Sequence, residues 1–147
     1  MTALSDAFRL QAAACAQLGS PFMARLCGFL ADRWPQASAL ARRCAEFDGD
    51  IGPGGASLPL RIAGGLHALV LKGADTALMR AYPPEEPDDD AFADAVLGAL
   101  QRHDAALARW IDSPPQTNEI RRSAALIAGA HVAYEICDLP IHLSELG

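Results

Sequence analysis

One stretch decides the fold class; it reads DDDAFADAVLGALQRHDAALARWI and occupies residues 88–111. Its inward-facing candidates recur at spacings of three and four, which is the period of one helix face; they are Phe92, Val96, Leu100, His103, Leu107 and Trp110. We therefore predict a single long helix from about Asp88 to Ile111, ended by Ser113-Pro114-Pro115. The acidic run 85–90 could be a binding patch, but we expect a solvated helix start, where carboxylates complement the helix dipole.

The same periodicity extends outward from this stretch in both directions. Further helices are expected at 5–19, 21–34, 36–47, 59–72, 75–82 and from 117 or 118 to 136. The first carries Leu4, Phe8, Gln11, Cys15 and Leu18 on one face, with Ser5 as its cap. The fold class is therefore all-α, an irregular bundle of about six or seven helices with a short C-terminal strand-like segment.

Glycine and proline divide these helices. Gly19 is a helix stop, Ser20-Pro21 is a helix start, and Gly73 is a C-cap. The pair Gly64-Gly65 lies inside a predicted helix, where each glycine costs about 1 kcal/mol relative to alanine. That cost indicates either a closely packed neighbouring helix or a distorted one. The glycine-rich loop 48–55 is expected to be a connector; a ligand lid is the alternative.

Composition excludes several classes of protein. The chain has 147 residues, 51% hydrophobic and 20% charged, with a net charge of −6. This balance argues against a nucleic-acid partner, and no apolar run is long enough for a membrane span. The N-terminus does not read as a signal peptide, so a cytoplasmic location is expected. The four cysteines are widely spaced, and we predict free, buried thiols; they are Cys15, Cys27, Cys44 and Cys137.

Candidate substrate residues gather at the start of the last predicted helix; they are Gln116, Thr117, Asn118, Glu119 and Arg122. One interpretation is a capping arrangement, in which Thr117 or Asn118 accepts from backbone amides. The other is a cleft, because a helix start with an arginine suits an anionic ligand group.

Three histidines lie on apolar helix faces: His67, His103 and His131. No two have the i, i+4 spacing of helical metal ligands, so we predict no metal site. Structural histidines are expected, with His67 as a further candidate for lining a cleft.

The end of the chain reads Leu139-Pro140-Ile141-His142-Leu143-Ser144-Glu145-Leu146-Gly147. An apolar strand that runs into an acidic residue and a glycine is typical of the first nucleotide-binding strand of a Rossmann-like domain. We therefore expect a helical domain at 1–138, followed at 139–147 by the first strand of a truncated Rossmann-like half. Glu145 and Gly147 would bind a cofactor only where that half is present.

Four segments resemble, in the same order, an uncharacterised bacterial family, domain-of-unknown-function family 2332; they are 8–15, 18–21, 65–73 and 115–124. The most specific part is Gln116-Thr117-Asn118-Glu119 with Arg122-Ser123. In that family the strand continues into a glycine-containing turn, and the downstream half looks like a class I, S-adenosylmethionine-dependent methyltransferase domain. The resemblance implies an N-terminal helical region without activity of its own, and S-adenosylmethionine as cofactor for a full-length form only.

Two functions follow from these observations. The first is the helical cap and substrate-recognition region of a methyltransferase-like protein. The second is a helical protein-interaction or self-association module without an enzymatic role. In either case the apolar residues Leu139, Ile141, Leu143 and Leu146 favour a homodimer, or association through the exposed C-terminal edge.

Overall fold

The structure is a computed structural model of the whole chain, and it describes residues 3–53 and 57–112. This part of the chain contains seven α-helices and no strand. The prediction of an all-α bundle is confirmed there. The expected last helix at 117–136 and the strand-like segment at 139–147 lie outside the described residues.

The helices follow the chain in simple order. They are α1 (Ala3–Gln17), α2 (Pro21–Arg33), α3 (Ala39–Ala45), α4 (Leu58–Leu71), α5 (Thr76–Met79), α6 (Asp89–Arg102) and α7 (Asp104–Asp112). None of those seven combines the length and apolar character that crossing a bilayer requires.

Local sequence explains most of the boundaries. The side chain of Ser20 accepts a hydrogen bond from the Met23 amide, and Pro21 occupies the first helical position of α2. Asp88 caps α6 in the same way by accepting from the Ala91 amide, and Asp89 and Asp90 lie in the first turn, so the second half of the acidic run is a helix start. Gly19 and Gly73 have φ angles of +92° and +66°, which glycine adopts without a steric penalty, and each follows the end of a helix.

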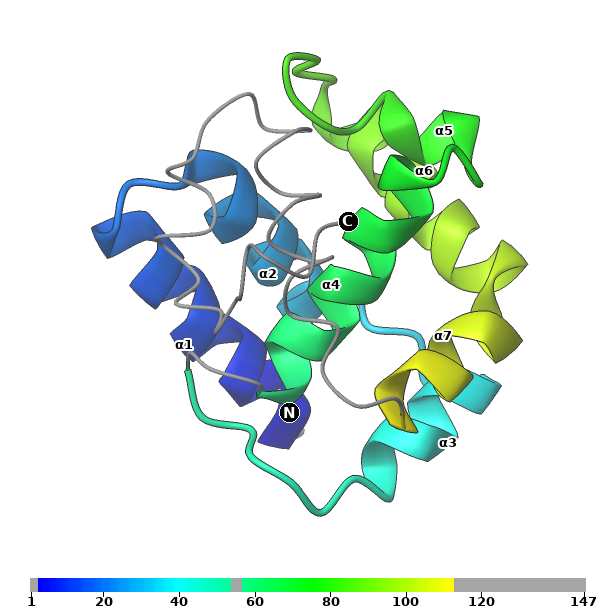
Figure 1. Cartoon of the computed structure of the whole chain (residues 1–147). Coiled ribbons are helices and arrows are strands. Elements are labelled where there is room, and N and C mark those ends of the chain that lie inside the picture. Colours follow the sequence, from blue (N-terminus) through cyan, green and yellow to red (C-terminus); the bar gives the residue numbers. More distant parts are fainter. Residues whose placement is uncertain (1–2, 54–56, 113–147) are drawn as a thin grey trace, which may run out of the picture.

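The helix α4 lies in the middle of the molecule, with α1 and α2 on one side and α7 on the other (Figure 1). Its composition fits that position, because it carries no charged residue except Arg61 and eleven of its residues are buried. The helices α1 and α2 pack against each other, and α3 packs against α7. The core contains the fully enclosed side chains of Phe8, Leu26, Leu30, Leu66 and Val96.

A close approach of α7 to α4 explains one of the two glycines in α4. A Cβ atom on Gly65 would lie 2.7 Å from Leu107 Cδ2 and 3.2 Å from Trp110 Cδ1. The sequence left two explanations for the glycine pair, a closely packed neighbour or a distorted helix. At Gly65 the first explanation is correct.

The predicted single helix at 88–111 is wrong, because it is two helices separated at His103. His103 has φ −112° and ψ 22°, outside the helical region. Its ring nitrogen Nε2 lies 3.0 Å from the Asp75 carboxylate, and the carboxylate of Asp104 binds backbone amides of α3. Both contacts are made with residues distant in the sequence. The spacing of apolar residues within 88–111 continues across position 103, so it does not indicate the break.

Smaller corrections concern helix ends. α1 begins at Ala3, so Ser5 is buried inside the helix and does not cap it. Leu18 follows the end of α1 and is 55% exposed, because the turn at Gly19 takes it off the apolar face. The helices predicted at 36–47 and 75–82 are shorter, at Ala39–Ala45 and Thr76–Met79. Ser38 caps α3, so this helix begins later than predicted, and both helices end two or three residues earlier than predicted.

Candidate functional site

Most of the predicted site residues lie outside the described part of the chain. These are Gln116, Thr117, Asn118, Glu119, Arg122, Glu145 and Gly147. Their roles stay predictions, and so does association through residues 139–147. The described residues do include α7, the helix before the first of these segments, as far as Asp112, and they show how its last described turn is held.

His67 is the one predicted site residue inside the described part. It lies on α4 and is 3% exposed. Its Nδ1 lies 2.7 Å from the Tyr82 hydroxyl, and the two rings meet edge to face. Desolvation in the core lowers the pKa of His67 to about 4, although Cys15 acts in the opposite direction. The ring is therefore neutral near pH 7 and shares one hydrogen bond with a buried phenol; its role in a cleft stays a prediction.

The thiols of Cys15, Cys27 and Cys44 are buried and form no disulfide. The prediction of free, buried thiols is confirmed for these three, and Cys137 lies outside the described residues. Burial raises the pKa of Cys44 to about 12, against a smaller opposing effect of Arg43. A neutral, enclosed thiol is a poor nucleophile, so these side chains act as small apolar core residues.

A charged cluster joins α5 to the break between α6 and α7. Asp75 is 5% exposed and caps α5 by accepting from the Leu78 amide at 2.9 Å. Its carboxylate also accepts from Arg102 Nη2 at 2.8 Å and contacts the ring of His103. Desolvation acts to raise the pKa of Asp75, but the hydrogen bonds from Leu78, Arg102 and His103 outweigh it and the pKa is lowered. Asp75 is therefore an anion that fixes a joint between three helices.

The C-terminal turn of α7 is held by two other helices. Arg61 of α4 donates to the Ile111 carbonyl at 3.2 Å, and Trp110 Nε1 donates back to the Arg61 carbonyl at 2.9 Å. On the other side Arg43 of α3 donates from Nε to Asp112 Oδ1 at 2.7 Å, and its Nη2 contacts the same oxygen. The end of α7 is therefore anchored to both α3 and α4.

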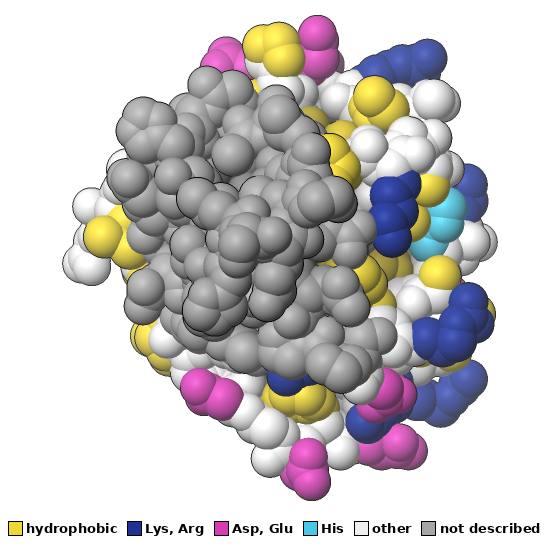
Figure 2. Space-filling model, in the orientation of Figure 1, with side chains coloured by type: hydrophobic (Ala, Val, Ile, Leu, Met, Phe, Trp, Pro, Cys, Tyr) yellow, Lys and Arg dark blue, Asp and Glu magenta, His cyan; other side chains and the backbone are white. Residues whose placement is uncertain are grey.

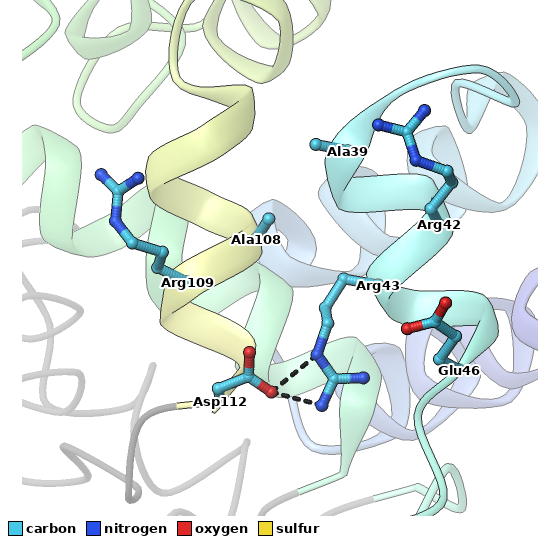
Figure 3. Close-up of a pocket in the computed structure, with 7 residues that line it drawn as sticks. All are labelled: Ala39, Arg42, Arg43, Glu46, Ala108, Arg109 and Asp112. Atoms are coloured by element: carbon cyan, nitrogen blue, oxygen red, sulfur yellow. Dashed lines mark hydrogen bonds and ion pairs between the residues drawn. The ribbon is translucent and has the colours of Figure 1, made fainter.

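A hollow of about 300 Å³ lies between α3 and α7 (Figure 3). Its lining residues are Ala39, Arg42, Arg43, Glu46, Ala108, Arg109 and Asp112. The ion pair between Arg43 and Asp112 crosses one end, and Arg42 lies near the other, beside Ala39 (Figure 3). Figure 2 shows several arginine or lysine side chains along the edge of the molecule where α7 and α3 lie in Figure 1.

Sequence reasoning missed both the Asp75 cluster and this hollow. The neighbouring arginines 42 and 43 on a short helix were a visible signal, as was the Arg109–Asp112 spacing one turn apart. Neither signal shows that α3 and α7 meet, because the contact depends on the break at His103. Within residues 3–53 and 57–112, no three side chains of His, Cys, Asp or Glu come together in a way that could hold a metal ion.

The described residues therefore define an all-helical protein in which His67 and Asp75 are buried and paired with other side chains, and in which an arginine-rich hollow lies between α3 and α7. The family described as uncharacterized protein conserved in bacteria (DUF2332) matches residues 5–147, and the chain belongs to that family. No curated protein and no solved structure matched the chain.

Proposed function

We propose that this chain is the helical cap and substrate-recognition region of an S-adenosylmethionine-dependent, methyltransferase-like protein, and that it is not catalytic by itself. The observation that carries the proposal is the anchored end of α7. Arg61 and Arg43 hold the backbone of Ile111 and the side chain of Asp112 against two other helices. The polar segment 116–122 follows a few residues later in the sequence. A recognition segment needs such a fixed starting point if its side chains are to be positioned over a substrate.

The pairing of buried titratable groups also supports a recognition role over a catalytic one for the helices themselves. His67 is enclosed with Tyr82, and Asp75 is saturated by the Leu78 amide, Arg102 and His103. General acids and bases need a free position within hydrogen-bond reach of a reacting group. The hydrogen-bonding positions of these side chains are instead occupied by other groups of the protein, as expected of a rigid scaffold.

The test compares the 147-residue chain with a longer form, extended by the sequence that follows this region in the family. Calorimetric titration of S-adenosylmethionine should show no binding to the 147-residue chain and binding to the longer form. The longer form should release S-adenosylhomocysteine when a bacterial metabolite extract supplies methyl acceptors. Asn118→Ala and Arg122→Ala should abolish this release and leave cofactor binding unchanged.

Arg80→Ala is the matched control, because Arg80 is an exposed arginine that follows the short helix α5. It should leave both cofactor binding and turnover intact. Failure of the longer form to bind S-adenosylmethionine would refute the proposal, as would micromolar binding by the 147-residue chain alone. Full turnover by the Asn118→Ala and Arg122→Ala variants would favour the alternative interpretation, in which these two residues only cap and brace a helix.

A further inference from the structure

The hollow between α3 and α7 is bordered by small side chains where the two helices approach each other. Ala39 of α3 and Ala108 of α7 project toward the space between the helices (Figure 3). Neither fills that space, so a volume of about 300 Å³ remains open to a ligand of a few heavy atoms. Larger apolar side chains at these two positions would fill the hollow while leaving its charged lining residues unchanged.

The lining is rich in arginine although the chain as a whole is acidic. Three of its seven lining residues are arginines, Arg42, Arg43 and Arg109, and two are carboxylates, Glu46 and Asp112, whereas the chain has a net charge of −6. Figure 3 shows Arg109 extending away from α3, so Arg42 and Arg43 are the arginines on the α3 side of the hollow.

These two arginines differ in what they already bind. Arg43 donates from two nitrogens to one oxygen of Asp112, which shows that a carboxylate fits this end of the hollow. The side chain of Arg42 is exposed and influences Asp104 through its charge, and it makes no hydrogen bond to any residue in the described ranges. Its five N–H donors are therefore open to a ligand.

We propose that the hollow between α3 and α7 is a binding site for an oxyanion, a phosphate or carboxylate group on a small molecule. Arg42 supplies the free donors, Ala39 and Ala108 leave the space, and Asp112 is an internal carboxylate that competes with the ligand for Arg43. Arginine is suited to both groups because its planar fork matches two oxygens at once.

The site deepens the proposed function, since it names the chemical class of the substrate that the cap would recognise. It rests on that function only in assigning the bound group to a substrate. Binding of the oxyanion itself is measured on the 147-residue chain without S-adenosylmethionine. A failure of the methyltransferase proposal therefore leaves the measurement intact, and a failure to bind oxyanions leaves the cap proposal standing.

The experiment titrates sodium phosphate into the 147-residue chain, with sodium acetate and sodium chloride as parallel arms at matched ionic strength. Amide chemical shifts of residues 39–43 and 108–112 report the site. Phosphate or acetate should shift these amides with saturation, and chloride should not. Comparison of the phosphate and acetate arms decides which oxyanion the hollow prefers.

Three substitutions define the mechanism. Arg42→Gln should weaken binding about tenfold by removing charge-assisted hydrogen bonds, and Ala108→Leu should block it by filling the hollow. Asp112→Asn should tighten binding several-fold, because it removes the carboxylate that occupies Arg43. Arg80→Gln, on an exposed arginine outside the hollow, is the control and should change nothing.

The direction in which Asp112→Asn changes oxyanion affinity distinguishes a binding site from a purely structural ion pair. A purely structural Arg43–Asp112 pair predicts a less stable protein with no gain in affinity. Unchanged or weaker phosphate and acetate binding in Asp112→Asn would overturn the proposal, provided that circular dichroism shows the variant folded. Equal shifts with chloride, or full binding by Arg42→Gln, would overturn it as well.

Discussion

His67 and Tyr82 form a polar pair inside an otherwise apolar core. The two atoms that meet, Nδ1 and the hydroxyl oxygen, are 2.7 Å apart, and both side chains are almost fully enclosed. Desolvation raises the pKa of Tyr82 well above its usual value and lowers that of His67. The pair is therefore neutral, and its stability depends on each partner satisfying the other.

Removing one partner should destabilise the protein. Tyr82→Phe keeps the ring but leaves Nδ1 of His67 without a hydrogen-bond partner, which we expect to cost about 1–3 kcal/mol of unfolding free energy. Urea denaturation followed by circular dichroism measures the change. The double variant His67→Leu with Tyr82→Phe should recover part of the loss, since neither residue then leaves an unpaired buried group. Additive losses in the double variant would contradict this account.

The same pair should make stability depend on pH. The pKa of His67 is about 4 in the folded protein against 6.5 for an ordinary histidine, so between these values the unfolded chain binds a proton that the folded one does not. Stability should therefore be complete above about pH 6.5 and fall as the pH drops toward 4, by about 3 kcal/mol.

Urea denaturation at a series of pH values tests this dependence. In His67→Gln, which has no titrating ring at position 67, the curve between pH 6.5 and 4 should be flatter than in the parent. Asp75, Asp104 and Asp112 have lowered pKa values, so their contributions are lost only below the ordinary carboxylate range. An equally steep loss in the His67→Gln variant would assign the acid sensitivity to other groups.

At the scale of helices, the close approach of α7 to α4 depends on the absence of a side chain at Gly65. A Cβ on Gly65 would approach a terminal methyl of Leu107 to 2.7 Å, and Leu107 is itself buried. The helix α7 sits at that distance because its last turn is bonded to Arg61 of the same helix α4. Gly65 and the hydrogen bonds of Arg61 therefore contribute to the same contact between α4 and α7: the glycine leaves room for it and the hydrogen bonds hold it.

Two glycine substitutions separate packing from helix propensity. Gly65→Ala should destabilise by about 1–3 kcal/mol, because overpacking outweighs the gain in propensity. Gly28→Ala in α2 is the control: a Cβ there meets nothing within 4 Å, so the variant should gain about 0.5–1 kcal/mol. Thermal or urea denaturation gives both values. A stabilised Gly65→Ala variant would mean that α7 moves away at little cost.

Helices with strong local signals could be predicted from sequence, and those governed by distant contacts could not. Ser20-Pro21 set the start of α2, and Gly73 follows the end of α4 as predicted, with a φ angle of +66°. The break at His103 was missed because its causes, Asp75 and the backbone of α3, are distant in sequence. The hollow was missed for the same reason.

At the scale of the whole molecule, the buried thiols report on cooperative unfolding. Cys15 and Cys27 are 0% exposed and Cys44 is 5% exposed, and they belong to three different helices. A disulfide reagent such as DTNB reaches them only through opening of the bundle.

We expect the three thiols to react at rates that fall together as stability is raised and to be fully reactive in denaturant. Mass spectrometry after alkylation at increasing urea identifies each site. Ser substitution of Cys137 removes the one cysteine outside the described residues from the measurement. Rapid modification of Cys44 alone in native buffer would show that α3 opens independently of the rest of the bundle.

The carboxylate of Asp104 has a consequence for the order in which the chain folds. It accepts from the amides of Ala39 and Leu40 at 2.9 and 2.8 Å, so the first residue of α7 completes the start of α3 from more than sixty positions away. A helix of seven residues does not persist alone in water. During refolding, amide protons of α3 should therefore gain protection from hydrogen exchange only when α7 docks. In the native protein they should exchange with the same opening free energy as those of α7, although the two helices are remote in sequence.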